Sequence, residues 1–447
     1  MTKAQSSNSA FRDTASTLTR GSFYTMLING VSALLTLGLH VALARALGHE
    51  NYSDYAYALT WLTILALPGV LGMDTAAQRY VSSYQAVADW PAMRGFMRQS
   101  ARLVLGSSLL LVALCAIALA VFSGQMRPEL AQVFWLATFA LPFTALLLLG
   151  VAILRGLRSP ILAALPRLIV RPALLGAAIL LIRGFVGDDL PSQVGMLVDL
   201  AATGAALALA VIFIRRCRPQ ALLSCAEETK TKEWLSVSLS MLGIALMQLL
   251  VRSTDTILIG FFHGTATSGP YSAANRIALL AAFGLMAVNA VLPPLIARYH
   301  VRGEKRDLQR LVTLAARVTF LFSVIATAVL VLLREPVLAA FGSEFSAAST
   351  ALVILCGGQL VNALTGSVGF VLSMTGNHRV VLTTLIWTTA GHAVLCVVLI
   401  PTHGIEGAAW ATASAIGISN IVLALRCRYS VSIDPSIFGL GRNQSAT

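Results

Sequence analysis

Long apolar segments are the feature that most constrains the fold of this chain. A helix needs about 20 mainly apolar residues to cross the hydrocarbon core of a bilayer, and segments of that kind recur twelve times in the 447 residues. They lie approximately at 21–44, 52–73, 101–123, 130–154, 160–182, 191–214, 235–262, 271–296, 314–333, 346–374, 380–400 and 407–425. Only 11% of the residues are charged, against roughly 25% in soluble domains. The sequence therefore predicts an all-α polytopic membrane protein.

The basic residues are distributed unevenly between the loops. With the N-terminus placed in the cytoplasm, 24 of the 32 Lys and Arg residues fall in cytoplasmic segments, four fall in outer loops and four lie inside spans. Lys and Arg are enriched in the cytoplasmic loops of membrane proteins. We therefore expect both termini to be cytoplasmic, and we interpret the net charge of +13 as a consequence of topology rather than of nucleic-acid binding. Neither a phosphate-binding GxxxxGK[ST] motif nor a metal-spaced cysteine cluster occurs, so we expect no nucleotide or metal cofactor.

The two halves of the chain resemble each other. Tyr52 and Tyr271 are 219 residues apart, as are Tyr80 and Tyr299, and each pair lies in matching local sequence. A repeat unit of six helices contains an even number of crossings, which makes the repeat parallel, as in transporters built from two lobes around a central cavity. The expected divisions are a first lobe at 1–214, a cytoplasmic linker at 215–234, a second lobe at 235–430 and a cytoplasmic tail at 431–447.

Six ionisable residues lie inside expected spans, which is costly in a membrane. Insertion scales give roughly 2.5–3.5 kcal/mol for each such residue at a helix centre, so six facing lipid would cost more than a typical folding free energy of about 5–15 kcal/mol. They must therefore face a partner, the bundle interior or a wet cavity. The six residues are Arg167, Arg171, Asp199, Arg252, Asp255 and Arg276.

The spacing of these residues suggests how they pair, and two interpretations stay open. Arg252 and Asp255 are three apart on one helix face, so they form either a structural pair or part of a cavity that binds or couples. Arg167 and Arg171 are four apart with no acid on their span, which suits phosphate, because the guanidinium binds phosphate oxygens bidentately. Alternatively, they reach the cytoplasmic interface or pair with Asp199.

The remaining two charges have similarly open roles. Arg276 lies about one turn into its span, where it either binds substrate or extends to the interface. Asp199 and Asp255 are candidates for a protonatable coupling group or for simple salt-bridge partners. We thus expect Arg252, Arg276, Arg167 and Arg171 to be the substrate-binding cations, and Asp255 and Asp199 to be coupling or pairing acids.

Three segments carry a resemblance to a known family. "ARALGHENYSDYAYA" (44–58), "STDTILIGFFHGTATSGPYSAANRI" (253–277) and "LIPTHGIEGAAWATA" (399–413) resemble the polysaccharide-transport family. This family contains the Wzx-like oligosaccharide flippases of the multidrug/oligosaccharidyl-lipid/polysaccharide exporter superfamily. The resemblance implies two six-helix lobes that form a V-shaped, alternating-access carrier in the inner membrane of a bacterium.

The resemblance also implies a substrate and a setting. The cargo would be a lipid-linked oligosaccharide, typically on undecaprenyl pyrophosphate, moved across the bilayer for surface or exopolysaccharide synthesis. Glycosyltransferases and a polysaccharide polymerase would be its partners, and an H⁺ or Na⁺ gradient is a possible coupling source. The alternative is a cation-coupled multidrug antiporter of the same superfamily, although arginines outnumber aspartates in the spans four to two. We do not expect an enzyme, because the outer loops are too short to hold a catalytic domain.

Overall fold

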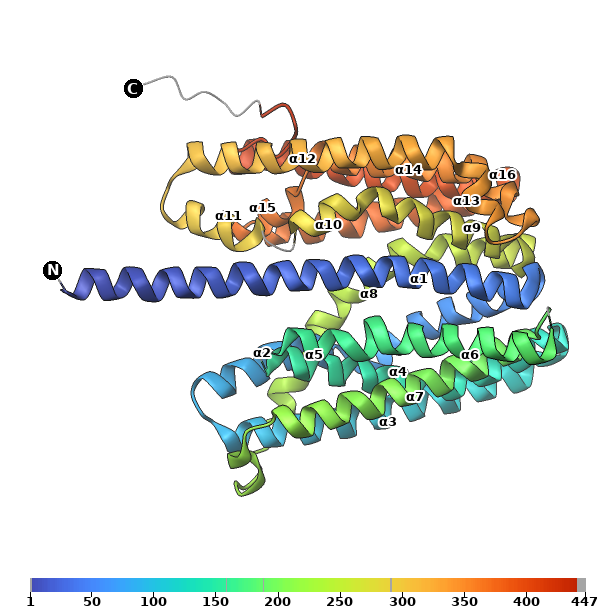
Figure 1. Cartoon of the computed structure of the whole chain (residues 1–447), viewed down its shortest axis with the longest axis horizontal. Helices are drawn as coiled ribbons and strands as arrows, with labels where there is room; N and C mark the ends of the chain where they lie inside the picture. Colours follow the sequence, from blue (N-terminus) through green and yellow to red (C-terminus); the bar gives the residue numbers. More distant parts are fainter. Residues whose placement is uncertain (1, 158, 188, 290–291, 440–447) are drawn as a thin grey trace.

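The structure, a computed structural model, describes residues 2–157, 159–187, 189–289 and 292–439, with side chains described from residue 30 onward except at a few helical positions. The described part is helical throughout (Figure 1). Nine of its helical stretches are long and apolar enough to cross a membrane. The prediction of an all-α membrane protein with many spans is thus confirmed at this level.

Two very long helices each cover two of the expected spans. The helix α1 (Thr2–Val70) covers the first two expected spans and breaks at Gly48, where φ is 74° and ψ is 173°. The helix α16 (His378–Ser430) covers the last two and breaks at Gly404, where φ is 55°. Residues with a Cβ rarely adopt positive φ, whereas glycine does so readily. Each glycine therefore lets the chain turn back while the helix on either side continues.

The other helices of the first half form one group with α1. They are α2 (Met73–Ala86), α3 (Trp90–Phe122), α4 (Pro128–Gly156), α5 (Pro160–Ala164), α6 (Arg171–Val186) and α7 (Ser192–Cys217). In Figure 1 these helices lie together below α1, and α4 packs directly on α1, α2, α3 and α7.

The helices of the second half form another group, drawn above α1 in Figure 1. They are α9 (Thr265–Ala278), α10 (Phe283–Asn289), α11 (Leu292–Val301), α12 (Lys305–Leu332), α13 (Arg334–Ala339), α14 (Ser349–Thr365), α15 (Val368–Met374) and α16. The helix α8 (Thr231–His263) covers the expected span 235–262; it packs on α16 and also on α1 and α2. The expected span 271–296 is a series of short helical segments rather than one helix: α9 is followed by a 3-10 turn at Leu279–Ala282 and then by α10 and α11, with Pro293 in the first turn of α11.

A π-helical turn at Leu165–Val170 separates α5 from α6 and contains Arg167. Pro166 lies within this turn and Pro172 lies just after it. Proline has no amide hydrogen to donate to the helix ladder, and such positions are frequent sites of π-bulges and bends. The expected single span at 160–182 is therefore irregular where it carries its two arginines.

The two groups meet along α1, which packs against α4 and α6 on one side and against α8 and α9 on the other. One continuous cluster of buried apolar side chains crosses this junction and contains both Tyr52 and Tyr271, each fully buried. The repeated tyrosines of the sequence thus occupy the contact between the groups. Aromatic side chains that bury this much area contribute strongly to such an interface.

The polar linker and the tail are both attached to neighbouring helices. Glu227 in the linker forms an ion pair with Arg98 of α3, and the Arg94 Nη1 donates to the Cys225 carbonyl at 2.6 Å. In the tail, the buried carboxylate of Asp434 accepts a hydrogen bond from the Arg428 Nη2 at 2.6 Å. The linker and the described part of the tail, up to residue 439, are therefore attached to neighbouring helices.

Candidate functional site

A cavity of about 370 Å³ lies where the two groups of helices meet. Its walls come from α1, α4, the π-helical turn, α6 and α7 on one side and from α8 and α9 on the other. Many lining side chains are polar but uncharged: Thr36, His40, Thr60, Thr63, Thr144, Thr203, Ser253, Thr256, Ser272 and Asn275. A cavity of this size and composition can hold water or a polar group within the membrane region.

Three of the four arginines that lie inside expected spans line this cavity: Arg167, Arg171 and Arg276. Arg171 does not stand free. Its Nε and Nη2 bond the two carboxylate oxygens of Asp199 at 3.0 and 2.8 Å, and its Nε also lies 2.9 Å from the hydroxyl of Thr203. This is the bidentate geometry that guanidinium and carboxylate groups favour. Of the three arrangements expected for Arg171, namely anion binding, reaching the cytoplasmic interface and pairing with Asp199, the structure contains the pair with Asp199.

Arg167 and Arg276 differ from Arg171 in having no such acid. In the described part of the chain, neither guanidinium makes a hydrogen bond or ion pair with another residue, and the Nε of Arg276 is buried without an acceptor. The hydroxyl of Thr144 on the same cavity wall is also buried without a partner. Buried donors without partners are rare, because each costs about 1–3 kcal/mol. These groups are therefore positioned to bond an acceptor that enters the cavity.

The fourth arginine, Arg252, has a side chain outside the described residues, so its expected pair with Asp255 has no structural test. Asp255 itself is fully buried. Its Oδ2 accepts hydrogen bonds from the hydroxyls of Tyr271 at 2.6 Å and Thr412 at 3.1 Å. Its Oδ1 accepts from the Thr256 amide at 2.7 Å. The carboxylate is thus held by neutral donors from three residues, one each on α8, α9 and α16.

This network extends to a histidine in the first half of α16. The Thr412 hydroxyl lies 3.1 Å from the His392 Nε2, and the same nitrogen lies 3.3 Å from the Cys396 sulfur. His392 is buried, and its Nδ1 has no partner among the described residues. From the sequence, His392 is an isolated histidine. Only the packing of α16 against α8 connects it to Asp255, through the hydroxyl of Thr412.

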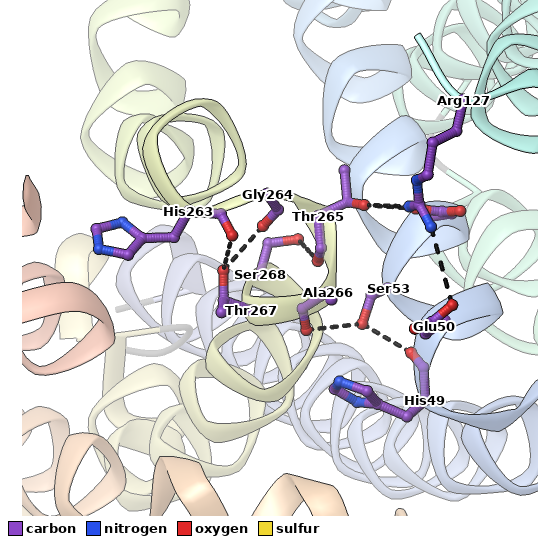
Figure 2. Close-up of polar contacts among 11 residues, drawn as sticks. His49, Glu50, Ser53, Arg127, His263, Gly264, Thr265, Ala266, Thr267 and Ser268 are labelled. Atoms are coloured by element: carbon purple, nitrogen blue, oxygen red, sulfur yellow. Dashed lines mark hydrogen bonds and ion pairs between the residues drawn. The ribbon is translucent and has the colours of Figure 1, made fainter.

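A second polar cluster joins α1, α4 and α9 at one end of the bundle, and sequence reasoning missed it. The buried Asp54 carboxylate Oδ1 accepts from the Arg127 Nη2 at 2.6 Å and from the Thr265 hydroxyl at 2.5 Å. Arg127 in turn lies 2.8 Å from the Thr265 hydroxyl and 3.9 Å from the exposed Glu50 carboxylate (Figure 2). We name Asp54, Arg127 and Thr265 the end latch, because they connect both helix groups. The sequence did contain a clue to this cluster, because Asp54 lies two residues after Tyr52, in the segment that resembles the one around Tyr271.

The backbones of α1 and α9 approach closely beside the end latch. The Ser53 hydroxyl donates to the Ala266 carbonyl at 3.2 Å (Figure 2). A Cβ added to Gly269 would overlap Ser53, so glycine is required for this approach. In the same region the Arg45 Nη2 donates to the Ala339 carbonyl at 2.5 Å. The cavity is therefore closed at this end by packed helices that share several hydrogen bonds.

The comparisons with known proteins bear on this architecture. A family model described as "Polysaccharide biosynthesis protein" matches residues 18–300. A probable low-salt glycan biosynthesis flippase, Agl15, of Haloferax volcanii is 26% identical over 180 residues, which are 40% of this chain and 38% of that protein. The match thus spans well under half of the curated relative.

Solved structures show the same fold at low sequence identity. An inward-facing multidrug-resistance MATE family transporter of the MOP superfamily aligns with a TM-score of 0.71 and 15% identity, over 93% of this chain and 96% of that one. The lipid II flippase MurJ, in an inward closed conformation, aligns with a TM-score of 0.68 and 13% identity, over 91% and 87%. The chain is a multi-pass membrane transporter rather than an enzyme, and because the family model covers more than half of its length, it belongs to the polysaccharide biosynthesis protein family.

Proposed function

We propose that the protein moves a lipid-linked oligosaccharide, carried on undecaprenyl pyrophosphate, from the cytoplasmic to the outer leaflet of the cytoplasmic membrane. The observation that carries this proposal is the pair of arginines, Arg167 and Arg276, without an acidic partner in a cavity between the helix groups. The family match and the name of the archaeal relative support a glycan flippase.

The chemistry of the cavity suits a pyrophosphate headgroup with sugars attached. Each hydrogen bond from a guanidinium to a charged acceptor contributes about 1.5–3 kcal/mol, and planar guanidinium groups match phosphate oxygens. The threonine, serine and asparagine side chains of the same wall can donate to or accept from sugar hydroxyls. We assign to Arg167 and Arg276 the binding of phosphate oxygens, with Arg252 as a further candidate from the sequence. Arg171, held by Asp199, supports the wall rather than binding directly.

The transport cycle we propose is alternating access between two six-helix lobes, 1–214 and 235–430. The end latch and the close contact of α1 with α9 hold one end shut. The positive-inside charge distribution supports an outer position for this closed end, and we take the described state to be open toward the cytoplasm. A ligand shifts such an equilibrium only through its different affinity for the two states. Phosphate bound to arginines from both lobes would supply that difference.

Asp255 is our candidate for coupling to an H⁺ or Na⁺ gradient. Its carboxylate is buried among neutral donors and is adjacent in sequence to Thr256, which lines the cavity. A buried carboxylate in a membrane bundle that binds and releases a cation changes the local charge by one unit, which biases the packing of α8 against α9 and α16. Glycosyltransferases that build the lipid-linked glycan and a polymerase that extends it are the partners this function requires.

Flipping is tested directly in vesicles. The purified protein is reconstituted with a fluorescent lipid-linked oligosaccharide on undecaprenyl pyrophosphate, and the fraction that reacts with a membrane-impermeant quencher is followed over time. We expect the wild-type protein to equilibrate the lipid, Arg276→Gln to slow it at least about tenfold, as one lost charged hydrogen bond implies, and Arg379→Gln, whose exposed side chain is outside the cavity, to retain the wild-type rate. Wild-type vesicles that match protein-free vesicles would overturn the proposal.

The multidrug antiporter alternative rests on the similarity of fold to the MATE transporter. The cavity cations oppose it, because unpaired arginines repel a cationic drug. The same vesicles loaded with an organic cation such as ethidium provide the test. Gradient-driven ethidium efflux without flipping of the glycan lipid would favour the antiporter.

A further inference from the structure

A second concavity lies on α16, apart from the central cavity. The two halves of α16 on either side of Gly404 fold back on each other. Residues 380–395 of the first half and 415–426 of the second half enclose a groove of about 480 Å³. Trp387, on one wall, is 77% exposed, and Ile418, on the other, is 53% exposed. Both belong to a candidate membrane span, so the groove opens toward lipid.

The lining of the groove is apolar despite its threonines. The hydroxyls of Thr383, Thr384 and Thr388 donate to the carbonyls four residues earlier in the same helix, at 3.0, 2.8 and 2.9 Å. Hydroxyls satisfied in this way turn toward their own backbone. The threonines therefore present methyl groups, and together with Trp387 and Ile418 they form a hydrocarbon-lined channel.

The groove is longer than one leaflet of the bilayer core is thick, and its charge lies at one end. Val380 and Leu395 are fifteen residues apart, which corresponds to about 22 Å along a helix at 1.5 Å per residue. One leaflet of a bilayer core of about 30 Å is about 15 Å thick. Arg426 lies near the end of the second half of α16 and lines the groove together with Val380. In the described part of the structure its guanidinium has no hydrogen-bonded or ionic partner, and its side chain is exposed.

We propose that this groove binds the isoprenoid chain of a polyprenyl phosphate lipid, with the phosphate on Arg426. A cation at the bilayer interface above a hydrocarbon channel complements an anionic headgroup above a long chain. The groove, of about 480 Å³, is bounded by the two halves of α16 alone, and we take it to hold one hydrocarbon chain. A phospholipid would have to leave its second chain outside, whereas a polyprenyl lipid has only one.

This inference rests on the proposed function and adds a step to it. The groove would be a loading site, where the carrier lipid waits in the membrane before its headgroup enters the central cavity. His392 lies at the floor of the groove and is linked through Thr412 to Asp255. A chain seated in the groove would therefore cover the membrane-facing side of the network that we assign to coupling.

The groove can be filled by one substitution. Gly391 lines it, and a Cβ at that position would meet no atom within 4 Å. Leucine also favours a helix over glycine. Gly391→Leu should therefore fold normally and occupy the channel. The matched control is Gly357→Leu, on the exposed face of α14, where an added Cβ also meets no atom within 4 Å.

The test is native mass spectrometry of the full-length protein in detergent, titrated with undecaprenyl phosphate, undecaprenol or phosphatidylglycerol. We expect undecaprenyl phosphate to bind at least about tenfold more tightly than undecaprenol, since a charged hydrogen bond corresponds to about that factor. Gly391→Leu and Arg426→Gln should each weaken its binding by a similar factor. Gly357→Leu and Arg379→Gln should leave it unchanged.

Two results would overturn the proposal. One is undecaprenyl phosphate binding that Gly391→Leu does not weaken. The other is phosphatidylglycerol binding of equal strength with the same dependence on Gly391 and Arg426, which would make the groove an ordinary phospholipid site. Arg276→Gln separates this inference from the proposed function, because it should slow flipping in vesicles at least about tenfold and leave groove binding intact. Normal groove binding by a wild-type protein that does not flip would refute the proposed function alone.

Discussion

The end latch makes a strong prediction about conformation. Asp54 is buried at 2% exposure, and its carboxylate is held by the Arg127 guanidinium at 2.6 Å and the Thr265 hydroxyl at 2.5 Å. Arg127→Gln removes the cation that neutralises this carboxylate and keeps a side chain of similar length. Because α1 and α4 belong to one helix group and α9 to the other, the change should weaken the contact between the groups.

The magnitude follows from the geometry. A hydrogen bond between charged partners contributes about 1.5–3 kcal/mol, and the half-exposed position of Arg127 favours the lower part of that range. A loss of about 2 kcal/mol in the closed state alone lowers the closed-to-open ratio by about 30-fold, since 1.4 kcal/mol corresponds to a factor of ten. That change should make an open form detectable where the wild-type protein is almost entirely closed at this end.

The assay is the distance between the two groups at this end. Phe185 at the end of α6 and Phe261 near the end of α8 are 90% and 75% exposed, and they belong to different groups. The partly exposed native cysteines are first replaced, and spin labels are then attached to cysteines introduced at these two positions. Double electron–electron resonance measures the distance between the labels. The Arg127→Gln protein should show a new, longer distance component.

Glu50→Gln is the matched control for this experiment. Its carboxylate also faces Arg127, but at 3.9 Å and with 73% of its side chain exposed. Exposed pairs of this kind contribute about 0–1 kcal/mol, so the distance distribution should stay near wild type. If Arg127→Gln and Glu50→Gln give the same distribution, the reasoning about the end latch is wrong.

The remaining predictions concern the buried acids and the topology. Asp199→Asn leaves a guanidinium in the bundle without its carboxylate, so we expect a loss of about 3–5 kcal/mol in stability, visible as a lower yield of folded protein in size-exclusion chromatography. Asp255→Asn keeps an oxygen that accepts from neighbouring hydroxyls, so we expect normal abundance together with loss of the dependence of transport on an imposed ion gradient. Reporter fusions after Arg218 and Ser430 should report the cytoplasm and a fusion after Gly264 the outside; the reverse at any of the three contradicts the proposed topology.

Local features of the sequence were sufficient for the fold class and the family. Apolar stretches of membrane-spanning length predicted a helical membrane transporter, and the three quoted segments identified the family that the model at residues 18–300 confirms. The membrane spans could be predicted from the sequence because a helix in a bilayer makes its backbone hydrogen bonds within its own segment, and because hydropathy is a property of contiguous residues. Helix boundaries were less accurate, since the joined helices at Gly48 and Gly404 depend on backbone turns.

The sequence by itself thus determined that Arg167, Arg171, Asp199, Asp255 and Arg276 cannot face lipid, because the cost of an exposed charge in a membrane does not depend on the details of packing. Which charge meets which partner was decided only by the tertiary structure. Arg171 met Asp199, 28 residues away, and left the other cavity arginines without an acid. The partners in the end latch are up to 211 residues apart. Hydropathy and periodicity describe one helix at a time, whereas hydrogen bonds between helices depend on how whole helices dock, and this docking is set by the shape of many side chains together.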